Sequence, residues 1–294
     1  MSLNLEMLQV ARLAPKLLGD STELVANYLQ SLLNEDGGFS DRSGTSDLYY
    51  TSFAIGGLLA LQQTLPVEPL ARYLKTFGDG EGLDLVYLAS LARCWSALPS
   101  VTPDAAWAEK LVERIAAHRS EDGGYHVERA SERGTVYGCF LALGAYQDLR
   151  RQLPSPLEML ACVQGLRCPD GSYSNSADMT IGLTPPSAAA AALLRHLGAP
   201  YQPELQAWLL ARFNTMGGFC VTPAIVVPDL LSTATALHAL SSLQAEFQML
   251  KEPCLDFIDS LWNARGGFHG SWEDDELDCE YTYYGLLALG HLSL

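Results

Sequence analysis

Basic residues are scarce in this chain of 294 residues. Lys and Arg together number 18, against 34 Asp and Glu, which gives a formal net charge of −16 at pH 7. Binding to nucleic acid or to an anionic membrane needs clustered positive charge. The charge balance therefore argues against both partners, and it disfavours a bound polyanion as well.

Long apolar runs and an N-terminal export signal are also missing. No apolar stretch reaches the ~20 residues of a membrane-spanning helix. The first residues, MSLNLEMLQVARLAPKLLGD, lack a basic region followed by an apolar block. The seven cysteines, an odd number, include no Cys-x-x-Cys pair, which favours reduced, buried thiols over disulfides. We expect a cytoplasmic protein without a membrane span.

A turn that combines an acidic or polar residue, glycine and an aromatic residue recurs along the chain. It reads NEDGGF at 34–39, EDGGY at 121–125, PDGSY at 169–173, MGGF at 216–219 and RGGF at 265–268. Equivalent positions follow one another at steps of 86, 48, 46 and 49 residues. The first step is about twice as long as the others, which predicts a degenerate copy of the turn near residue 81. The stretch FGDGEGLDLVYLASLARCWSAL occurs there, at 77–98. The pattern indicates six internal repeats.

Each repeat predicts two helices of different character. Amphipathic helices precede the turns, for example at 21–33 and 103–118, and helices with few charged residues follow them, at 47–61, 84–98, 135–149, 185–197, 229–243 and 278–292. A helix that is apolar on nearly all sides must be buried, whereas an amphipathic one can face water.

Two concentric rings of helices follow from this difference. The fold class is all-α, and the predicted architecture is an α/α toroid of six helical hairpins with GGF- or GGY-type turns. An open helical solenoid is the alternative. Residues 1–294 are expected to form one domain, with residues 1–20 as an N-terminal extension or leading helix.

The turns and inner helices resemble the terpenoid cyclase and protein prenyltransferase superfamily, and most of all the prenyltransferase β subunits. The GGF turns, DLYYTSFAIGGLLAL at 47–61 and DCEYTYYGLLALGHL at 278–292 carry the resemblance, which covers residues ~20–294. It implies an α/α toroid, an isoprenoid substrate, transferase activity and zinc. A separate helical-repeat α subunit is the partner that it implies.

The zinc ligands that this resemblance implies are incomplete here. The family uses an Asp, a Cys and a His near the starts of the fifth and sixth inner helices. Asp229 matches the Asp, but Leu231 and Tyr281 stand at the Cys and His positions. Neither replaces a thiolate or an imidazole on zinc. Cys279, beside Asp278, is the candidate that could form a metal site with Asp229 in which the set of ligands is changed.

The cations that the resemblance implies for a prenyl diphosphate are missing from GGFCVTPAIVVPD at 217–229. Burying a diphosphate without counter-charge costs several kcal/mol or more, so a neutral isoprenoid is easier to bind. Arg133 is the basic residue that resembles a cavity arginine of the family. A solvated loop arginine is the alternative interpretation.

Six carboxylates lie within eight residues of SWEDDELDCEY, at 271–281. Crowded carboxylates raise one another's pKa or bind a hard cation such as Mg²⁺, although negative charge is also favourable before a helix. The cyclase branch uses a DxDD motif to protonate an alkene or an epoxide, and this sequence has no DxDD. Asp274, Asp275 and Asp278 are the candidate catalytic acids in its place.

Aromatic and acidic residues gather at the starts of the predicted inner helices. Rings around a central cavity would suit an isoprenoid chain or a carbocation, and ordinary core packing is the alternative. We take Tyr50, Tyr137, Tyr281 and Trp272 as candidate substrate contacts. The aspartates that open inner helices are expected to be N-caps, namely Asp47, Asp84, Asp229 and Asp278.

Three functional hypotheses follow. The first is an isoprenoid-handling, prenyltransferase-like protein with an apolar central cavity, which catalyses prenyl transfer or a diverged form of it. The second is a non-catalytic toroid that serves as a binding or scaffold module. The third is a cyclase-like enzyme that uses the carboxylates at 273–280. Zinc and magnesium are the candidate cofactors, and a helical-repeat protein or a second copy of the chain is the candidate partner.

Overall fold

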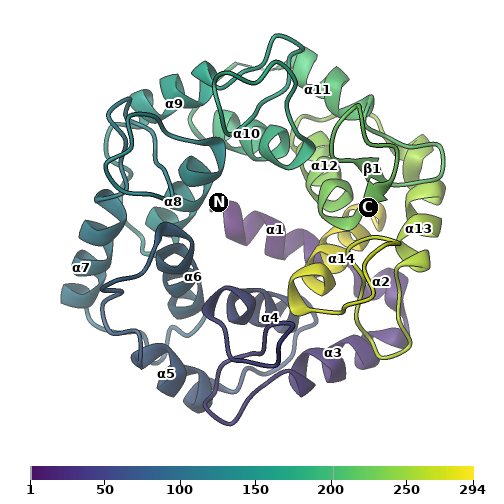
Figure 1. The fold of residues 1–294 in the computed structure, drawn as a ribbon. Helices are drawn as coiled ribbons and strands as arrows, with labels where there is room; N and C mark the ends of the chain where they lie inside the picture. The colour runs from purple at the N-terminus through teal and green to yellow at the C-terminus, as the bar shows by residue number, and fades with distance from the viewer. Residues whose placement is uncertain (1, 201) are drawn as a thin grey trace.

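The computed structural model describes residues 2–200 and 202–294, whose helices form two concentric rings (Figure 1). The inner ring contains α4 (Leu48–Ala60), α6 (Leu85–Ser96), α8 (Val136–Asp148), α10 (Thr184–His196), α12 (Leu230–Ser242) and α14 (Cys279–Leu292). The outer ring contains α3 (Ser21–Ser31), α5 (Val67–Lys75), α7 (Ala105–Ala116), α9 (Pro156–Gly165), α11 (Pro203–Leu210) and α13 (Lys251–Ser260). The all-α toroid predicted from the sequence is confirmed.

The inner ring is closed. Each inner helix packs against the next, and α14 packs against α4, which rules out the open solenoid. The predicted inner helices match the observed ones to within a residue or two, because nearly uncharged helices had to be buried. In α4 nearly every residue is buried. In α7 Leu111 and Ile115 are buried, and the other residues are partly or fully exposed.

The glycine turns join outer to inner helices through a buried aromatic residue. Phe39 pairs with Leu33 through an isolated β-bridge, and its side chain is completely buried. Its backbone N–H donates to the Thr51 hydroxyl of the following inner helix at 2.9 Å. The same burial and bridging occur at the equivalent positions Tyr125, Tyr173, Phe219 and Phe268.

Gly37 shows why the turn needs glycine. Its φ is +97°, which side-chain-bearing residues rarely adopt. A Cβ at this position would lie 2.0 Å from the carbonyl oxygen of Pro69 in α5. The turn therefore rests directly on the start of the next outer helix, and a larger residue would separate the two.

Aspartates open four of the inner helices, as the sequence predicted. In α4, α6, α12 and α14 the N-cap side chain accepts a hydrogen bond from a backbone N–H of the first turn, at Asp47, Asp84, Asp229 and Asp278. Tyr87 Oη of α6 donates a hydrogen bond of 2.5 Å to Oδ2 of Asp47, the N-cap of α4. Such contacts join the start of one inner helix to the start of the next. The starts of the inner helices thus surround one mouth of the ring.

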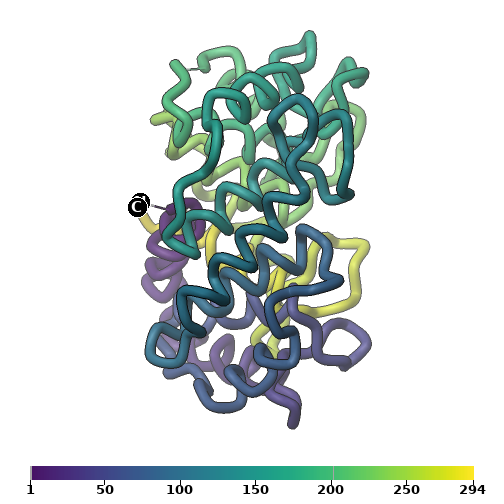
Figure 2. Tube along the Cα trace, turned by 90° about the vertical axis from the view of Figure 1, so that its left-hand side faces the viewer, coloured from purple at the N-terminus to yellow at the C-terminus, as the bar shows by residue number. Residues whose placement is uncertain are grey.

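The opposite mouth is crossed by α1 (Leu3–Ala11), which lies in the centre of the ring in Figure 1. The Leu3 N–H donates to Gln147 Oε1 at 2.8 Å, and Asn4 Nδ2 donates to Asp148 Oδ2 at 2.7 Å, both at the end of α8. Figure 2 shows α1 and the end of α14 at the same end of the ring. The helix therefore closes the mouth at which the inner helices terminate.

The remaining elements are short. They are α2 (Pro15–Leu18), the 3₁₀ helix η1 (Gln248–Leu250) and the antiparallel pair β1 (Phe219–Cys220) and β2 (Pro228–Asp229). Within residues 2–200 and 202–294, no helix has both the length and the apolar character needed to cross a bilayer.

Candidate functional site

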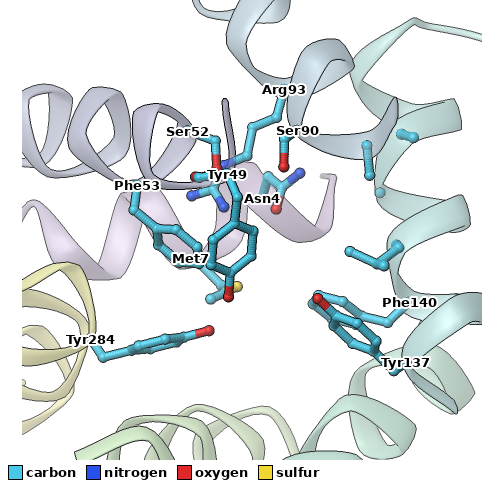
Figure 3. Close-up of a pocket in the computed structure, with 14 residues that line it drawn as sticks. Asn4, Met7, Tyr49, Ser52, Phe53, Ser90, Arg93, Tyr137, Phe140 and Tyr284 are labelled. Atoms are coloured by element: carbon cyan, nitrogen blue, oxygen red, sulfur yellow. Dashed lines mark hydrogen bonds between the residues drawn. The ribbon is translucent and has the colours of Figure 1, made fainter. Parts of the chain in front are cut away.

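A central cavity lies between the starts of the inner helices and α1. Its larger part has a volume of about 300 Å³ and a smaller, adjoining part about 90 Å³, which is at the low end of the range for small-molecule sites. Both parts share Met7 of α1, Tyr49 of α4, Tyr137 and Phe140 of α8, and Tyr284 of α14. Figure 3 shows these side chains around one space.

The cavity walls are mainly apolar and aromatic. Phe53 packs edge to face on Tyr49, with 4.9 Å between ring centroids, and lies 5.6 Å from the Tyr284 ring. Leu231 and Leu287 line the larger part. Such walls bind hydrocarbon chains by removing apolar surface from water, and the faces of their rings attract a positive charge.

Glu280, in the first turn of α14, is the acidic residue that lines this cavity. Tyr49 Oη donates a hydrogen bond to its Oε1 at 2.7 Å. Burial raises the pKa of Glu280 to about 7, the hydrogen bond from Tyr49 opposes this shift, and the negative charge of Asp278 adds to it. A large fraction of Glu280 therefore carries its proton at neutral pH, and general acids act best in this range.

His238 lies deeper in the larger part of the cavity. It belongs to the third turn of α12, whereas Leu231 and Thr235 of the same helix line the wall nearer the mouth. Its Nδ1 is 3.0 Å from Nε2 of His291 on α14. Burial lowers the pKa of His238 to about 4 and lowers that of His291 as well. Both imidazoles are therefore neutral at physiological pH.

Arg93 of α6 is the basic residue on the wall of the smaller part. Its guanidinium lies over the rings of Phe53 and Tyr283, 5.3 and 5.2 Å from their centroids. Burial raises the pKa of nearby Asp148 to about 6, and the hydrogen bond from Asn4 and the charge of Arg93 oppose that shift. A single guanidinium that is covered by two rings is a poor match for the several charges of a prenyl diphosphate.

The predicted catalytic acids lie at the rim, outside the cavity. Arg42 forms ion pairs with Asp274 and Asp278, at 2.8 and 2.7 Å, and Asp275 is exposed to solvent. Burial raises the pKa of Asp278, and the hydrogen bonds from the Tyr281 backbone and Arg42 oppose this shift. Two residues along a helix amount to a rotation of ~200°, which separates Asp278 from Glu280. A catalytic role for the three aspartates stays a prediction.

One of the predicted substrate contacts, Tyr137, lines the cavity. Tyr281 packs at the rim instead, where Arg42 lies 5.4 Å from its ring centroid. Trp272 is 43% exposed and packs on Phe257 of α13, in the outer ring. Arg133 is exposed in the loop before α8.

The residues at the metal positions do not fit a zinc site. Asp229 Oδ1 caps α12, and Cys279 Sγ is buried and donates to the carbonyl oxygen of Tyr50 at 3.0 Å. Burial raises the pKa of this thiol, which opposes thiolate formation. Leu231 and Tyr281 supply no better ligand, and the described residues contain no group of three or more His, Cys, Asp or Glu that could hold a metal. A metal bound by Asp229 and Cys279 stays a prediction.

Glu280 and His238 line the cavity but are not among the substrate contacts predicted from the sequence. In the sequence, Glu280 is one of six crowded carboxylates, and His238 lies within the helix predicted at 229–243. A helical signal was present, because Glu280, Tyr284, Leu287 and His291 follow one another at spacings of four, three and four residues. Those spacings place residues on one face of a helix, and this face of α14 carries the carboxyl, the phenol and the imidazole.

A comparison with protein families matches the prenyltransferase alpha-alpha toroid domain at residues 5–103 and 187–293, more than half of the chain. A search of curated proteins found no match. Among solved structures, Candida albicans protein geranylgeranyltransferase-I complexed with GGPP is 13% identical and has a TM-score of 0.69. That similarity covers 92% of this chain and 90% of the other.

Two further solved structures show how widely this fold is used. The type II terpene cyclase MstE from Scytonema is 15% identical, with a TM-score of 0.62 over 94% of this chain and 97% of the other. The GH76A alpha-1,6-mannanase from Salegentibacter sp. HEL1_6 is 11% identical, with a TM-score of 0.61 over 93% and 98%. Identities this low establish a shared fold alone. By its family match, the chain belongs to the prenyltransferase alpha-alpha toroid domain family.

Proposed function

We propose that this toroid binds an uncharged, isoprenoid-type chain in its central cavity, as a diverged form of the prenyltransferase-like proteins. The observation that carries the proposal is the cavity lining, in which Tyr49, Tyr137, Phe140 and Tyr284 surround the space and the one guanidinium, Arg93, is covered by rings. This lining favours hydrocarbon over sugar, because sugar hydroxyls need many polar partners when they are buried. It also favours an alcohol over its diphosphate.

Calorimetric titration with farnesol, geranylgeraniol and their diphosphates tests the proposal. We expect the alcohols to bind and the diphosphates to bind more weakly. Ala189→Phe places a ring in the larger part of the cavity and should weaken binding of the alcohols about tenfold or more. Ala207→Phe, on the exposed face of α11, is the matched control. Tighter binding of a diphosphate than of its alcohol would contradict the proposal.

A second candidate function, cyclase-like acid catalysis, is favoured by Glu280. A carboxyl of pKa about 7 is a weaker acid than a free carboxyl. It therefore protonates a basic oxygen more readily than a carbon–carbon double bond. Glu280 would donate its proton to an epoxide oxygen at the outer end of the chain as the C–O bond breaks and its electron pair moves to the oxygen. The resulting cation would lie near aromatic rings, and loss of a proton from an adjacent carbon to the Glu280 carboxylate would give an alkene alcohol.

Product analysis separates this catalytic function from binding alone. Incubation with a terminal epoxide of farnesol, followed by gas chromatography and mass spectrometry, should give an isomer of unchanged mass. Glu280→Gln should abolish conversion while binding persists, and Glu273→Gln at the exposed part of the acidic stretch should leave conversion unchanged. Conversion that survives in Glu280→Gln would exclude Glu280 as the acid.

A further inference from the structure

The His238–His291 pair presents one nitrogen to the cavity. Nδ1 of His238 and Nε2 of His291 are 3.0 Å apart, which is a hydrogen-bond distance. His291 is only 2% exposed, and its Nδ1 has no hydrogen-bond partner among the described residues. His238 is partly exposed and lines the larger part of the cavity. The remaining nitrogen is Nε2 of His238. Whether it carries a proton decides whether the deep end of the cavity offers a ligand a hydrogen-bond donor or an acceptor.

The position of the protons follows from the cost of an unpaired N–H. Each neutral imidazole carries one N–H and one acceptor nitrogen. If His238 donated from Nδ1, His291 would carry its own proton on Nδ1, as a buried N–H without an acceptor. If His291 donates from Nε2, its buried Nδ1 is a bare lone pair, and His238 carries its proton on Nε2. Orphaned buried N–H groups are rarer than under-satisfied acceptors, so the second arrangement is favoured.

The deep end of the cavity then presents a donor that no described residue accepts. Among the described residues, Nε2 of His238 has no hydrogen-bond partner. Leu287, Ala188 and Ala192 contribute apolar surface to the same wall. A ligand that covers this N–H without offering an acceptor leaves it buried and unpaired, which is unfavourable.

We infer that the Nε2–H of His238 binds an acceptor oxygen at the inner end of the ligand. This inference rests on the proposed function and names its substrate class: an uncharged, isoprenoid-type chain that carries a hydroxyl, carbonyl or ether oxygen at the end that enters first. A pure hydrocarbon leaves the N–H unpaired. The opposite end of such a chain then lies near the mouth, where Glu280 lines the wall.

Four ligands with the same C15 chain test the inference on the unmodified protein: farnesol, farnesal, farnesyl methyl ether and farnesene. We expect the three oxygen-bearing ligands to bind about tenfold more tightly than the hydrocarbon, since the hydrocarbon would bury this N–H without an acceptor whereas an oxygen accepts from it. Binding of the aldehyde and the ether shows that the protein is the donor, because neither can donate a proton.

Variants locate the effect at His238. His238→Phe keeps a ring but removes the donor, and it should bring all four ligands to nearly equal affinity. His238→Gln keeps a donor and should restore part of the preference. Ser241→Ala, on the same helix but not among the residues that line the cavity, is the control and should leave the preference unchanged. Thermal unfolding checks that each variant is folded.

Nitrogen-15 NMR of histidine-labelled protein gives an independent readout that needs no ligand. We expect His238 to be protonated on Nε2, with its signal assigned by its loss in His238→Phe. Protonation on Nδ1 instead, or an oxygen preference that survives in His238→Phe, would overturn the inference and leave the proposed function standing. Failure of the folded, unmodified protein to bind any of the four ligands would overturn both.

Discussion

Tyr49 donates a hydrogen bond of 2.7 Å to Glu280 across the point where the first and last inner helices of the ring meet. Burial raises the pKa of the Tyr49 phenol, so the phenol keeps its proton and serves as the donor. The bond holds the Glu280 carboxyl against the cavity wall and partly offsets the cost of burying it. Because the bond stabilises the charged form more than the neutral form, Tyr49→Phe should raise the pKa of Glu280 further.

The proton on Glu280 makes the stability of the protein depend on pH. Its pKa rises from an ordinary value of 4.5 to about 7 in the folded state. The folded state therefore holds the proton more tightly than the unfolded state, and the stabilisation is fully present below pH 4.5 and is lost as pH rises through 7. We expect the free energy of unfolding of the wild type to fall by about 1–3 kcal/mol more than that of Glu280→Gln between about pH 4.5 and about pH 8.5.

Urea unfolding at a series of pH values measures this difference. Other groups also titrate in this range, including Asp148, whose pKa is about 6, and they cancel when the two proteins are compared. Glu273→Gln, at an exposed position, is the control and should follow the wild type. Parallel curves for the wild type and Glu280→Gln would show that Glu280 is not protonated in the folded state at neutral pH.

Loss of Arg42 should destabilise the rim of the cavity. Arg42→Ala removes the partner of Asp278, whose side chain is 2% exposed, and of the more exposed Asp274. A buried carboxylate without its partner is costly, but Arg42 is itself one-third exposed, so we expect a loss of about 1–3 kcal/mol. Asp274→Asn, which removes the outer partner alone, should cost less than about 1 kcal/mol.

The pH dependence of this loss has a definite sign. The charge of Arg42 lowers the pKa of Asp278, which burial raises, so Arg42→Ala should raise that pKa further. The deficit of the variant should then shrink as pH falls and Asp278 takes up a proton. Chemical denaturation near pH 7 and near pH 4 checks this, and a deficit that grows on acidification would count against the ion pair.

The threonines behind the aromatic turns should differ in their importance. Thr51 accepts the Phe39 N–H at 2.9 Å, whereas Thr282 accepts the Phe268 N–H at 3.4 Å, and both threonines are fully buried. Thr51→Val removes the acceptor of a well-formed hydrogen bond and leaves the Phe39 N–H unpaired, which should lower the free energy of unfolding by about 1–3 kcal/mol. Thr282→Val should cost less, because the bond that it removes is longer and weaker. Equal losses in thermal unfolding would show that the turn N–H finds another acceptor.

The length of chain that the cavity accepts should depend on Met7 of α1. Met7 lines both parts of the cavity and is 8% exposed. Met7→Ala should cost about 2 kcal/mol or more in stability and should shift the binding preference from farnesol towards geranylgeraniol. Leu5→Ala, on the same helix but 41% exposed, is the control. An unchanged chain-length preference in Met7→Ala would place the ligand away from α1.

The helices could be predicted from the sequence because their signals are local. Uncharged runs, aspartate N-caps and glycine turns each act within a few residues. They predicted a helix at 229–243, close to the observed α12 at Leu230–Ser242. Two rings also followed, since the two helix types differ in their need for burial.

The cavity residues could not be predicted in the same way, because they depend on how each helix is rotated. The sequence shows an acidic run before and into α14, but only the rotation of that helix sends Asp278 to Arg42 and Glu280 to Tyr49. The His238–His291 contact joins residues 53 apart. Likewise, Asn4 of α1 meets Asp148 across 144 residues, and no local pattern predicts that this helix crosses the ring.

The closure of the ring between α14 and α4 also bears on how the chain folds. The contacts of Cys279 with Tyr50, Glu280 with Tyr49 and Asp278 with Arg42 join residues 229, 231 and 236 apart. Contacts between such distant residues form slowly, because a long loop must close first. Helical hairpins can assemble earlier, but a partly assembled ring has a gap where Glu280 and Tyr49 should meet. The cavity is complete only when this junction is closed, because Tyr49 of α4 and Glu280 of α14 line it from the two sides of the junction.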